Sequence, residues 1–234
     1  MKLDHYASFA KVFEYPEEDY HEVVIEAIKA LGDSYPQSTK ELEKFLELLP
    51  MQTGELQELY SKSFEVQAVT SLDVGYVLYG DDYQRGVIMV NLKEEHNKAN
   101  NSCGEELADF LPNLLRLLPK MQDPETIHEL VTMLIAIAVE KMMEEYDAST
   151  LKAKDVLYKK QHKTLITPTL PITIFLHAFK ALYLAFDSDF ALIKTKKLFK
   201  GESFIGHIRN ELEVQEGKQS SNSCDTGGCG TGSC

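Results

Sequence analysis

Residues 123–146, DPETIHELVTMLIAIAVEKMMEEY, restrict the possible folds more strongly than any other stretch of the chain. Their apolar residues recur at helical intervals, which is typical of a helix that buries one wide face. Met133, Ala136 and Ile137 make the same helix apolar on its other faces too. We therefore predict that this helix lies at the centre of the hydrophobic core. Its main apolar face is formed by Ile127, Leu130, Val131, Leu134, Ile135, Ala138, Val139 and Met142.

Helical spacing continues through most of the chain, and no stretch alternates like a strand between turn signals. We predict an all-α single domain over residues 1–214, a bundle of roughly eight to ten helices with short connections. Residues 215–234 are rich in glycine and serine, lack an apolar anchor and are predicted to be disordered. The other predicted helices cover residues 19–31, 38–50, 53–64, 71–80, 81–99, 107–121, 152–163, 172–186 and a short amphipathic stretch around 192–199.

Several helix ends carry recognisable signals. Ser38 is a predicted N-cap, with Glu41 three residues later as its capping-box partner. Gly80 suits the end of one helix because glycine accepts a positive φ without strain. Asp81 or Asp82 can then cap the next helix. The stretch LYGDDYQRG, residues 78–86, is thus predicted to join two helices.

Charge and hydropathy exclude two classes of protein. The net charge is −13, which argues against a nucleic-acid binder because phosphate neutralisation requires a surplus of lysine and arginine. The apolar stretch Val131–Val139 is too short to span a bilayer, and Leu165–Phe186 contains Pro168 and Pro171. The N-terminal residues MKLDHYASFAKVFEYP lack the apolar region of a secretory signal. We therefore expect a cytoplasmic protein that is not integral to a membrane.

The common catalytic motifs are absent. The sequences that begin at His21 and His128 resemble the start of a zinc-protease helix but lack the second histidine four residues later. No G-x-S-x-G motif occurs, and the Gly-x-Gly run from Gly228 to Gly232 has no strand before it and no helix after it. His177, on an apolar helix, is predicted to be a hydrogen-bonded core histidine. We expect that the protein is not an enzyme and has no resident cofactor.

Three cysteines near the C-terminus leave one question open. Cys224, Cys229 and Cys234 are spaced five residues apart in a glycine-rich context. Thiolates are soft ligands, so these cysteines could hold zinc, copper(I) or iron and act in metal delivery. Zinc sites, however, usually pair cysteines two to four residues apart and use four ligands. A disordered tail without a metal is the alternative.

Residues 56–118 contain a set of motifs that resembles a known family. LYSKSF is followed by SLDVGYVLYGDDYQRG and then by EELADFLP. This order is similar to the NarJ-type chaperones that assemble the molybdenum cofactor of respiratory nitrate reductase, also called its delta subunit, within the redox-enzyme maturation chaperones. Ala108 departs from the family pattern, which has proline at that position. The matching residues are Tyr60, Phe64, Leu72, Tyr76, Tyr79, Gly80, Arg85, Gly86, Leu92, Glu106, Leu107, Asp109, Leu111 and Pro112.

The resemblance implies a partner. A chaperone of this kind binds the apo catalytic subunit of a respiratory molybdoenzyme, with the nitrate reductase alpha subunit as the first expectation. It is expected to bind the N-terminal segment of that subunit and to promote cofactor insertion before membrane docking. Two alternatives remain: a different molybdenum oxidoreductase, recognised through a twin-arginine signal peptide, or a metal carrier that acts through the tail cysteines.

Two roles are open for the residues of the resembling motifs. Arg85 could form a structural clamp with an acidic partner such as Glu106 or Asp109, and so fix the angle between helices. Alternatively, the aromatic and acidic residues could line a groove that takes the apolar face of a basic peptide. The residues expected to bind the client are Tyr60, Phe64, Tyr76, Tyr79, Arg85, Glu106 and Asp109.

Overall fold

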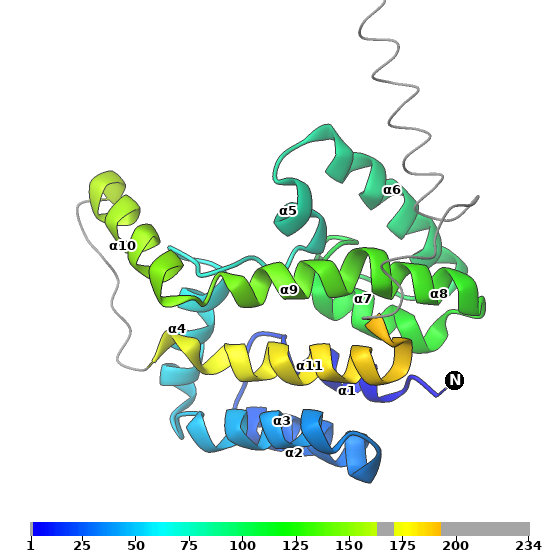
Figure 1. The fold of residues 1–234 in the computed structure, drawn as a ribbon, viewed down its shortest axis with the longest axis horizontal. Coiled ribbons are helices and arrows are strands. Elements are labelled where there is room, and N and C mark those ends of the chain that lie inside the picture. Colours follow the sequence, from blue (N-terminus) through cyan, green and yellow to red (C-terminus); the bar gives the residue numbers. More distant parts are fainter. Residues whose placement is uncertain (1, 163–170, 193–234) are drawn as a thin grey trace, which may run out of the picture.

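The computed structural model describes residues 2–162 and 171–192, and within these ranges the prediction of an all-α fold is confirmed (Figure 1). The only β-type pairing in these ranges is an isolated bridge between Asp73 and Phe110. The helices are α1 (His5–Val12), α2 (Tyr20–Leu31), α3 (Pro36–Leu48), α4 (Thr53–Phe64), α5 (Val74–Tyr79), α6 (Tyr83–Lys98), α7 (Leu111–Leu117), α8 (Pro124–Leu130), α9 (Ala136–Glu144), α10 (Ala148–His162) and α11 (Phe175–Phe190).

The helix predicted over residues 123–146 is confirmed as a nearly continuous rod. It consists of α8, a π-helical segment Val131–Ile135 and α9. Asp123 caps its start, since the Asp123 side chain accepts from the backbone N–H groups of Glu125 and Thr126. The apolar face predicted from the sequence is buried throughout, so this rod lies in the core as expected.

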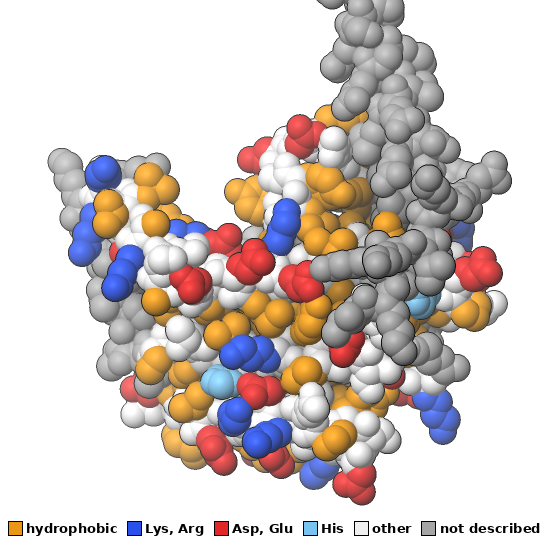
Figure 2. Space-filling view, in the orientation of Figure 1, with side chains coloured by type: hydrophobic (Ala, Val, Ile, Leu, Met, Phe, Trp, Pro, Cys, Tyr) orange, Lys and Arg blue, Asp and Glu red, His pale blue; other side chains and the backbone are white. Residues whose placement is uncertain are grey.

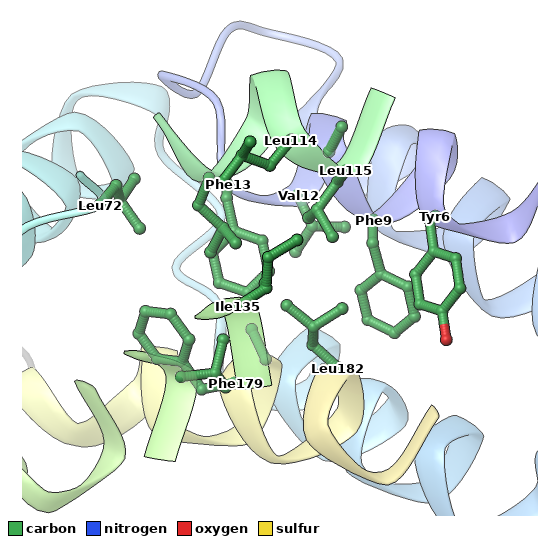
Figure 3. Packing of buried hydrophobic residues seen from close by; sticks show 14 of the residues in the cluster. Tyr6, Phe9, Val12, Phe13, Leu72, Leu114, Leu115, Ile135, Phe179 and Leu182 are labelled. Atoms are coloured by element: carbon green, nitrogen blue, oxygen red, sulfur yellow. The ribbon is translucent and has the colours of Figure 1, made fainter. Parts of the chain in front are cut away.

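The core is formed where the rod and α11 pack side by side, with α3 on α11 and with α1 held between α2 and α7 (Figure 1). Figure 3 shows aromatic side chains from the N-terminal part of the chain meeting α11. The ring centroids of Phe13 and Phe179 lie 4.9 Å apart, and Ile135 of the π-helical segment packs beside them (Figure 3). Large apolar side chains are worth about 1.5–3 kcal/mol each when buried, so this contact contributes to the stability of the core.

A carboxylate joins the first and last described helices. Asp189 of α11 accepts hydrogen bonds of 2.7 Å from the hydroxyls of both Tyr6 and Tyr35. The Nε2 atom of His5 lies 3.0 Å from the same carboxylate. Because all three partners lie before α3, this cluster ties the start of the chain to α11.

Two sequence-based expectations need correction. Ser38 is not an N-cap, because α3 begins at Pro36, whose fixed φ suits the first turn of a helix. Ser38 is instead buried, and its hydroxyl donates to the carbonyl oxygen of Ala181 at 2.6 Å, which links α3 to α11. His177 is hydrogen-bonded as expected but is only partly buried, with Nδ1 2.7 Å from Oε2 of Glu41.

Two further expectations concern membrane spans and the C-terminal residues. Within the described ranges, no helix combines the length and the apolar character needed to cross a membrane. The short helix expected around residues 192–199 and the predicted disordered tail lie outside these ranges, apart from Leu192.

Candidate functional site

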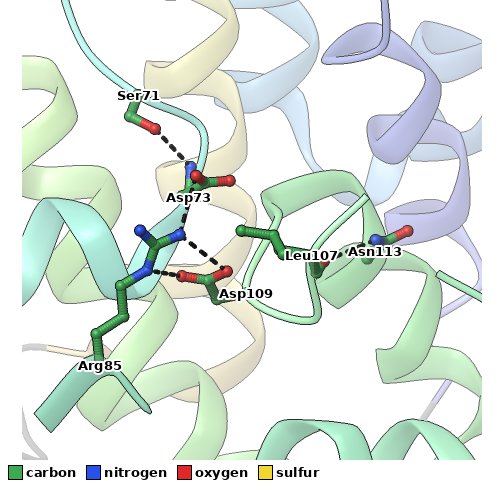
Figure 4. Close-up of polar contacts among 6 residues, drawn as sticks. All are labelled: Ser71, Asp73, Arg85, Leu107, Asp109 and Asn113. Carbon is green, nitrogen blue, oxygen red and sulfur yellow. Dashed lines mark hydrogen bonds and ion pairs between the residues drawn. The ribbon is translucent and has the colours of Figure 1, made fainter. Parts of the chain in front are cut away.

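A short backbone contact brings together two segments that are far apart in the sequence. Both belong to the motifs that resemble the NarJ-type family. The N–H of Val74 donates to the carbonyl oxygen of Asp109 at 2.9 Å, and the N–H of Leu111 donates to that of Leu72 at 2.9 Å. The whole α5–α6 hairpin lies between these segments in the sequence. The pairing therefore places Asp73, just before α5, beside Asp109, just before α7 (Figure 4).

Arg85, in the first turn of α6, binds both of these aspartates (Figure 4). Its Nε donates to Oδ2 of Asp109 at 2.9 Å, and its Nη2 lies 3.4 Å from Oδ1 of the same carboxylate. Nη2 also donates to Oδ2 of Asp73 at 3.0 Å. We call these three residues the Arg85 clamp. Of the two acidic partners expected for Arg85, Glu106 and Asp109, the structure shows Asp109, and sequence analysis missed Asp73.

The charged side chains of the Arg85 clamp are largely removed from water, which makes each charge costly unless it is paired. The exposed fraction of the side chain is 0% for Asp109, 15% for Arg85 and 28% for Asp73. Burial raises the pKa of Asp73, and the negative charge of Asp109 adds to this, while Arg85 opposes it. Burial alone would lower the pKa of Arg85, but its hydrogen bond to Asp109 and the two carboxylate charges raise it. With one guanidinium for two carboxylates, the ionised clamp carries one net negative charge.

Gly75, in the first turn of α5, makes room for the clamp. A Cβ atom at this position would lie 2.7 Å from Oδ2 of Asp109 and 3.1 Å from Cγ of Arg85. Both separations are too short for carbon in ordinary contact, so only glycine allows the carboxylate to approach the α5 backbone this closely. Sequence analysis gave Gly75 no role.

Tyr76 connects the clamp to the surface. The guanidinium carbon of Arg85 lies 5.4 Å from the centroid of the Tyr76 ring, within the range of a cation–π interaction. Tyr76 nevertheless remains 44% exposed, and Tyr79 and Tyr83 are exposed as well. We call Tyr76, Tyr79 and Tyr83 the α5–α6 tyrosines. They lie next to the exposed acids Asp81 and Asp82 of the connecting turn.

The remaining predicted site residues lie behind or beside this surface. Tyr60 is buried, and its hydroxyl donates to the carbonyl oxygen of Phe13 at 3.1 Å, so it supports the core and offers no surface to a peptide. Phe64 packs edge-on against Tyr60 and against Phe175, with centroids 4.9 and 4.8 Å apart. Glu106 is exposed, and its charge contributes to the raised pKa of both Tyr60 and Asp73, after the larger effect of burial. The structure thus brings Tyr76, Arg85 and Asp109 into contact, with Glu106 nearby.

A buried polar network fixes the loop that carries Glu106 and Asp109. The Nε2 atom of His96 lies 3.0 Å from the carbonyl oxygen of Ala108, and its Nδ1 lies 2.9 Å from Nδ2 of Asn101. Asn113 donates to the carbonyl oxygen of Leu107 at 2.9 Å (Figure 4). Both ring nitrogens of His96 are therefore engaged, which holds the loop in place. Sequence analysis did not identify this network, because its members are separated by irregular intervals.

His96 should make stability depend on pH. Burial lowers its pKa and the charge of Lys120 adds to this, while the hydrogen bond to Ala108 opposes it. The unfolded chain, with a histidine pKa of about 6.5, then binds the proton more readily than the folded chain. The free energy of unfolding should retain this contribution above about pH 6.5 and lose it as the pH falls through the folded pKa. Urea denaturation of the wild type and of His96→Gln across this range measures the difference. Equal pH slopes in the two proteins would contradict the assignment.

Across residues 2–162 and 171–192, no group of three histidine, cysteine, aspartate or glutamate side chains is placed to hold a metal ion. The tail cysteines Cys224, Cys229 and Cys234 lie outside these ranges. No protein-family model matches the chain, and no curated protein shows significant similarity to it.

Proposed function

We propose that this chain is a chaperone for the apo catalytic subunit of a respiratory molybdoenzyme, with nitrate reductase as the first candidate. It would bind the N-terminal segment of that subunit and promote molybdenum cofactor insertion before the enzyme docks at the membrane. One observation carries the proposal: the Arg85 clamp joins the segments that resemble the NarJ-type family, and it presents the half-exposed Tyr76 at the surface above it.

The exposed residues suit an amphipathic basic peptide. Tyrosines provide large rigid contact areas at low entropic cost, and they are common anchors at protein interfaces. The apolar side of a peptide would contact Tyr76 and Tyr79, while its basic residues would face Asp81, Asp82 and Glu106. The net charge of −13 would steer such a peptide towards the protein.

Release of the client requires that the affinity of the chaperone for the client fall during maturation. A chaperone favours the unfilled client only if it binds that state more tightly than the cofactor-loaded state. The N-terminal segment is accessible before the client closes around its cofactor, and it would be withdrawn afterwards. In this mechanism the chaperone acts by holding the client open and performs no bond-making step.

Calorimetry with a synthetic peptide tests the proposal. The peptide should correspond to the N-terminal segment of the nitrate reductase catalytic subunit from the same organism. Replacing Tyr76 and Tyr79 together with alanine should weaken binding at least about tenfold, because interface aromatics commonly contribute 1–2 kcal/mol or more. Leu48→Ala, at a comparably exposed position on α3, is the matched control and should bind as the wild type does.

The same experiment separates the two possible clients. A twin-arginine signal peptide from another molybdenum oxidoreductase serves as the second ligand. Tighter binding of that peptide would redirect the proposal to the second client. If neither peptide binds, or if apo and cofactor-loaded catalytic subunits bind equally, the proposed function is wrong.

A further inference from the structure

Helix α10 projects from the body of the molecule and is attached to it along one side (Figure 1). The side chain of Lys154 donates to the carbonyl oxygen of Val69, and the hydroxyl of Tyr158 donates to that of Ala68 at 3.1 Å. Lys154 also pairs with Glu145, 2.8 Å away at the end of the rod. Because residues 154 and 158 lie on one side of the helix, the opposite side of α10 faces away from these contacts.

The outward side of α10 combines basic and apolar side chains. Helical spacing and exposure place five residues there: Lys152, Val156, Leu157, Lys159 and Lys160. Val156 is 55% exposed and Leu157, at the edge of this side, is 50% exposed. Lys152 lies one turn before Val156, and Lys160 lies one turn after it. We call these five residues the α10 outer face.

Helix α10 is basic in a protein that is otherwise acidic. It contains four lysines and one acidic residue, Asp155, whereas the whole chain has 24 basic and 37 acidic residues. In the part of the chain that the structure describes, no carboxylate forms an ion pair with Lys152, Lys159 or Lys160. Figure 2 shows basic and apolar side chains together on α10, at the upper left. The α10 outer face is therefore open to an anionic partner that also accepts apolar groups.

An anionic bilayer supplies both kinds of contact in the required order. Its headgroups carry phosphate anions at the surface, and its acyl chains begin just beneath them. Val156 and Leu157 can enter this boundary, while the flanking lysines extend their charged ends towards the phosphates. A nucleic acid would pair with the lysines but would leave the two apolar side chains in water. A single helix face is also convex, so it offers no groove to a peptide and suits a flat, deformable surface.

The acidic remainder of the protein determines how it can approach such a bilayer. A helix of 15 residues is about 22 Å long, and charges at physiological ionic strength are largely screened beyond about 8 Å. Because α10 projects from the body (Figure 1), its lysines can reach the headgroups before most acidic side chains come within this distance. The acidic residue Asp147 lies before α10, where it accepts from the N–H of Ser149 at 2.8 Å. The last two turns of α10, with Lys159 and Lys160, therefore make the closest approach.

We propose that the α10 outer face binds the surface of a bilayer that contains anionic lipid. Val156 and Leu157 enter the boundary between headgroups and acyl chains, and the three lysines contact lipid phosphates. α10 and the α5–α6 hairpin project on the same side of the molecule (Figure 1), so the α5–α6 tyrosines lie near the membrane when α10 is bound. Lipid binding by α10 does not depend on the proposed function.

Sedimentation of the full-length protein with vesicles tests the binding. Vesicles of phosphatidylcholine with about 30% phosphatidylglycerol should bind the protein, and added salt should weaken this binding. Vesicles of phosphatidylcholine alone should bind much less. Replacing Lys152, Lys159 and Lys160 together with glutamine should lower the partition coefficient about 100-fold, since each lysine near an anionic surface contributes roughly fivefold. Equal binding to both kinds of vesicle overturns the proposal.

A matched variant separates local charge from net charge. Replacing Lys29, Lys40 and Lys93 together with glutamine changes the net charge by the same amount, at exposed positions on α2, α3 and α6. This variant should bind anionic vesicles nearly as the wild type does. Equal losses in the two triple variants overturn the assignment to α10. Glutamine is a good helix former, so α10 should persist, and far-ultraviolet circular dichroism of both variants checks this.

Fluorescence tests the entry of the apolar residues into the bilayer. The chain contains no tryptophan, so a single introduced tryptophan reports on its own position alone. With anionic vesicles, the emission of Leu157→Trp should shift to shorter wavelength, because the indole ring moves from water into the interface. Leu48→Trp, on α3, is the control, since Leu48 is 47% exposed and Leu157 is 50% exposed. Its emission should not shift. An unchanged emission from Leu157→Trp overturns the proposal.

Two further outcomes identify which proposal fails. Poly-glutamate is the probe for an acidic protein partner. If the wild type binds poly-glutamate through the three lysines but does not bind anionic vesicles, the partner is an acidic protein and the lipid proposal is wrong. Vesicle binding without binding of the client peptide would refute only the proposed function. Peptide binding without vesicle binding would refute only the lipid proposal.

Discussion

Replacing Arg85 with alanine is expected to lower the free energy of unfolding by about 3–5 kcal/mol. The substitution leaves the carboxylate of Asp109 fully buried with no counter-charge, and it leaves Asp73 beside it with the same charge. Taking one partner from a buried ion pair costs more than the pair itself contributes, because the remaining charge stays desolvated. Urea denaturation, with the transition followed by circular dichroism, measures the change.

Two further variants identify the cause of this loss. Arg85→Ala combined with Asp109→Asn should recover part of the stability, because no charge then remains buried without a partner. Lys98→Ala removes the ion pair, 2.7 Å long, between the largely exposed side chain of Lys98 and the partly buried Glu95 one turn earlier on the same helix. It should cost only a few tenths of a kcal/mol, roughly 0.3–0.5. If Arg85→Ala proves no more destabilising than Lys98→Ala, the clamp does not stabilise the fold.

The positions of most helices were predictable because apolar spacing depends only on local sequence, although α1 was not predicted. The rod of α8 and α9 follows directly from its wide apolar face, and Gly80 ends α5 at the predicted residue with a positive φ of 63°. The π-helical segment Val131–Ile135 could not be predicted in this way. Residues 131–135 are apolar apart from Thr132, so apolar spacing does not distinguish an α-helical from a π-helical hydrogen-bond pattern there.

Within the Arg85 clamp, only the ion pair of Arg85 with a carboxylate was predictable from the sequence. Arg85 required a nearby carboxylate, and Asp109 was one of two named candidates. Asp73 and Gly75 could not be found, because their roles depend on the backbone bridge that sets residues 72–74 against residues 109–111. The role of Tyr60 could not be predicted because an aromatic residue suits both a groove and a core. In the structure Tyr60 is buried in the core.

Gly75→Ala should lower the free energy of unfolding by about 2–3 kcal/mol, although alanine is a better helix former than glycine. The added methyl group would lie 2.7 Å from Oδ2 of Asp109, so either the carboxylate or α5 must move. Moving the carboxylate lengthens its bond to Arg85 and weakens a buried charge pair. Thermal unfolding measured alongside urea denaturation would quantify this loss.

Gly86→Ala provides the matched control for Gly75→Ala, because both glycines lie in the first turns of helices in the same hairpin. A Cβ atom at Gly86 meets no atom within 4 Å, and the backbone there is helical. This substitution should therefore raise the free energy of unfolding, by about 0.4–1 kcal/mol, since alanine restricts the unfolded chain. Opposite signs in the two variants would trace the effect of Gly75→Ala to the clamp, because helix propensity alone predicts the same sign for both. Two stabilising substitutions would mean that the carboxylate of Asp109 can move away from α5 without loss, and that Gly75 is not required for the clamp.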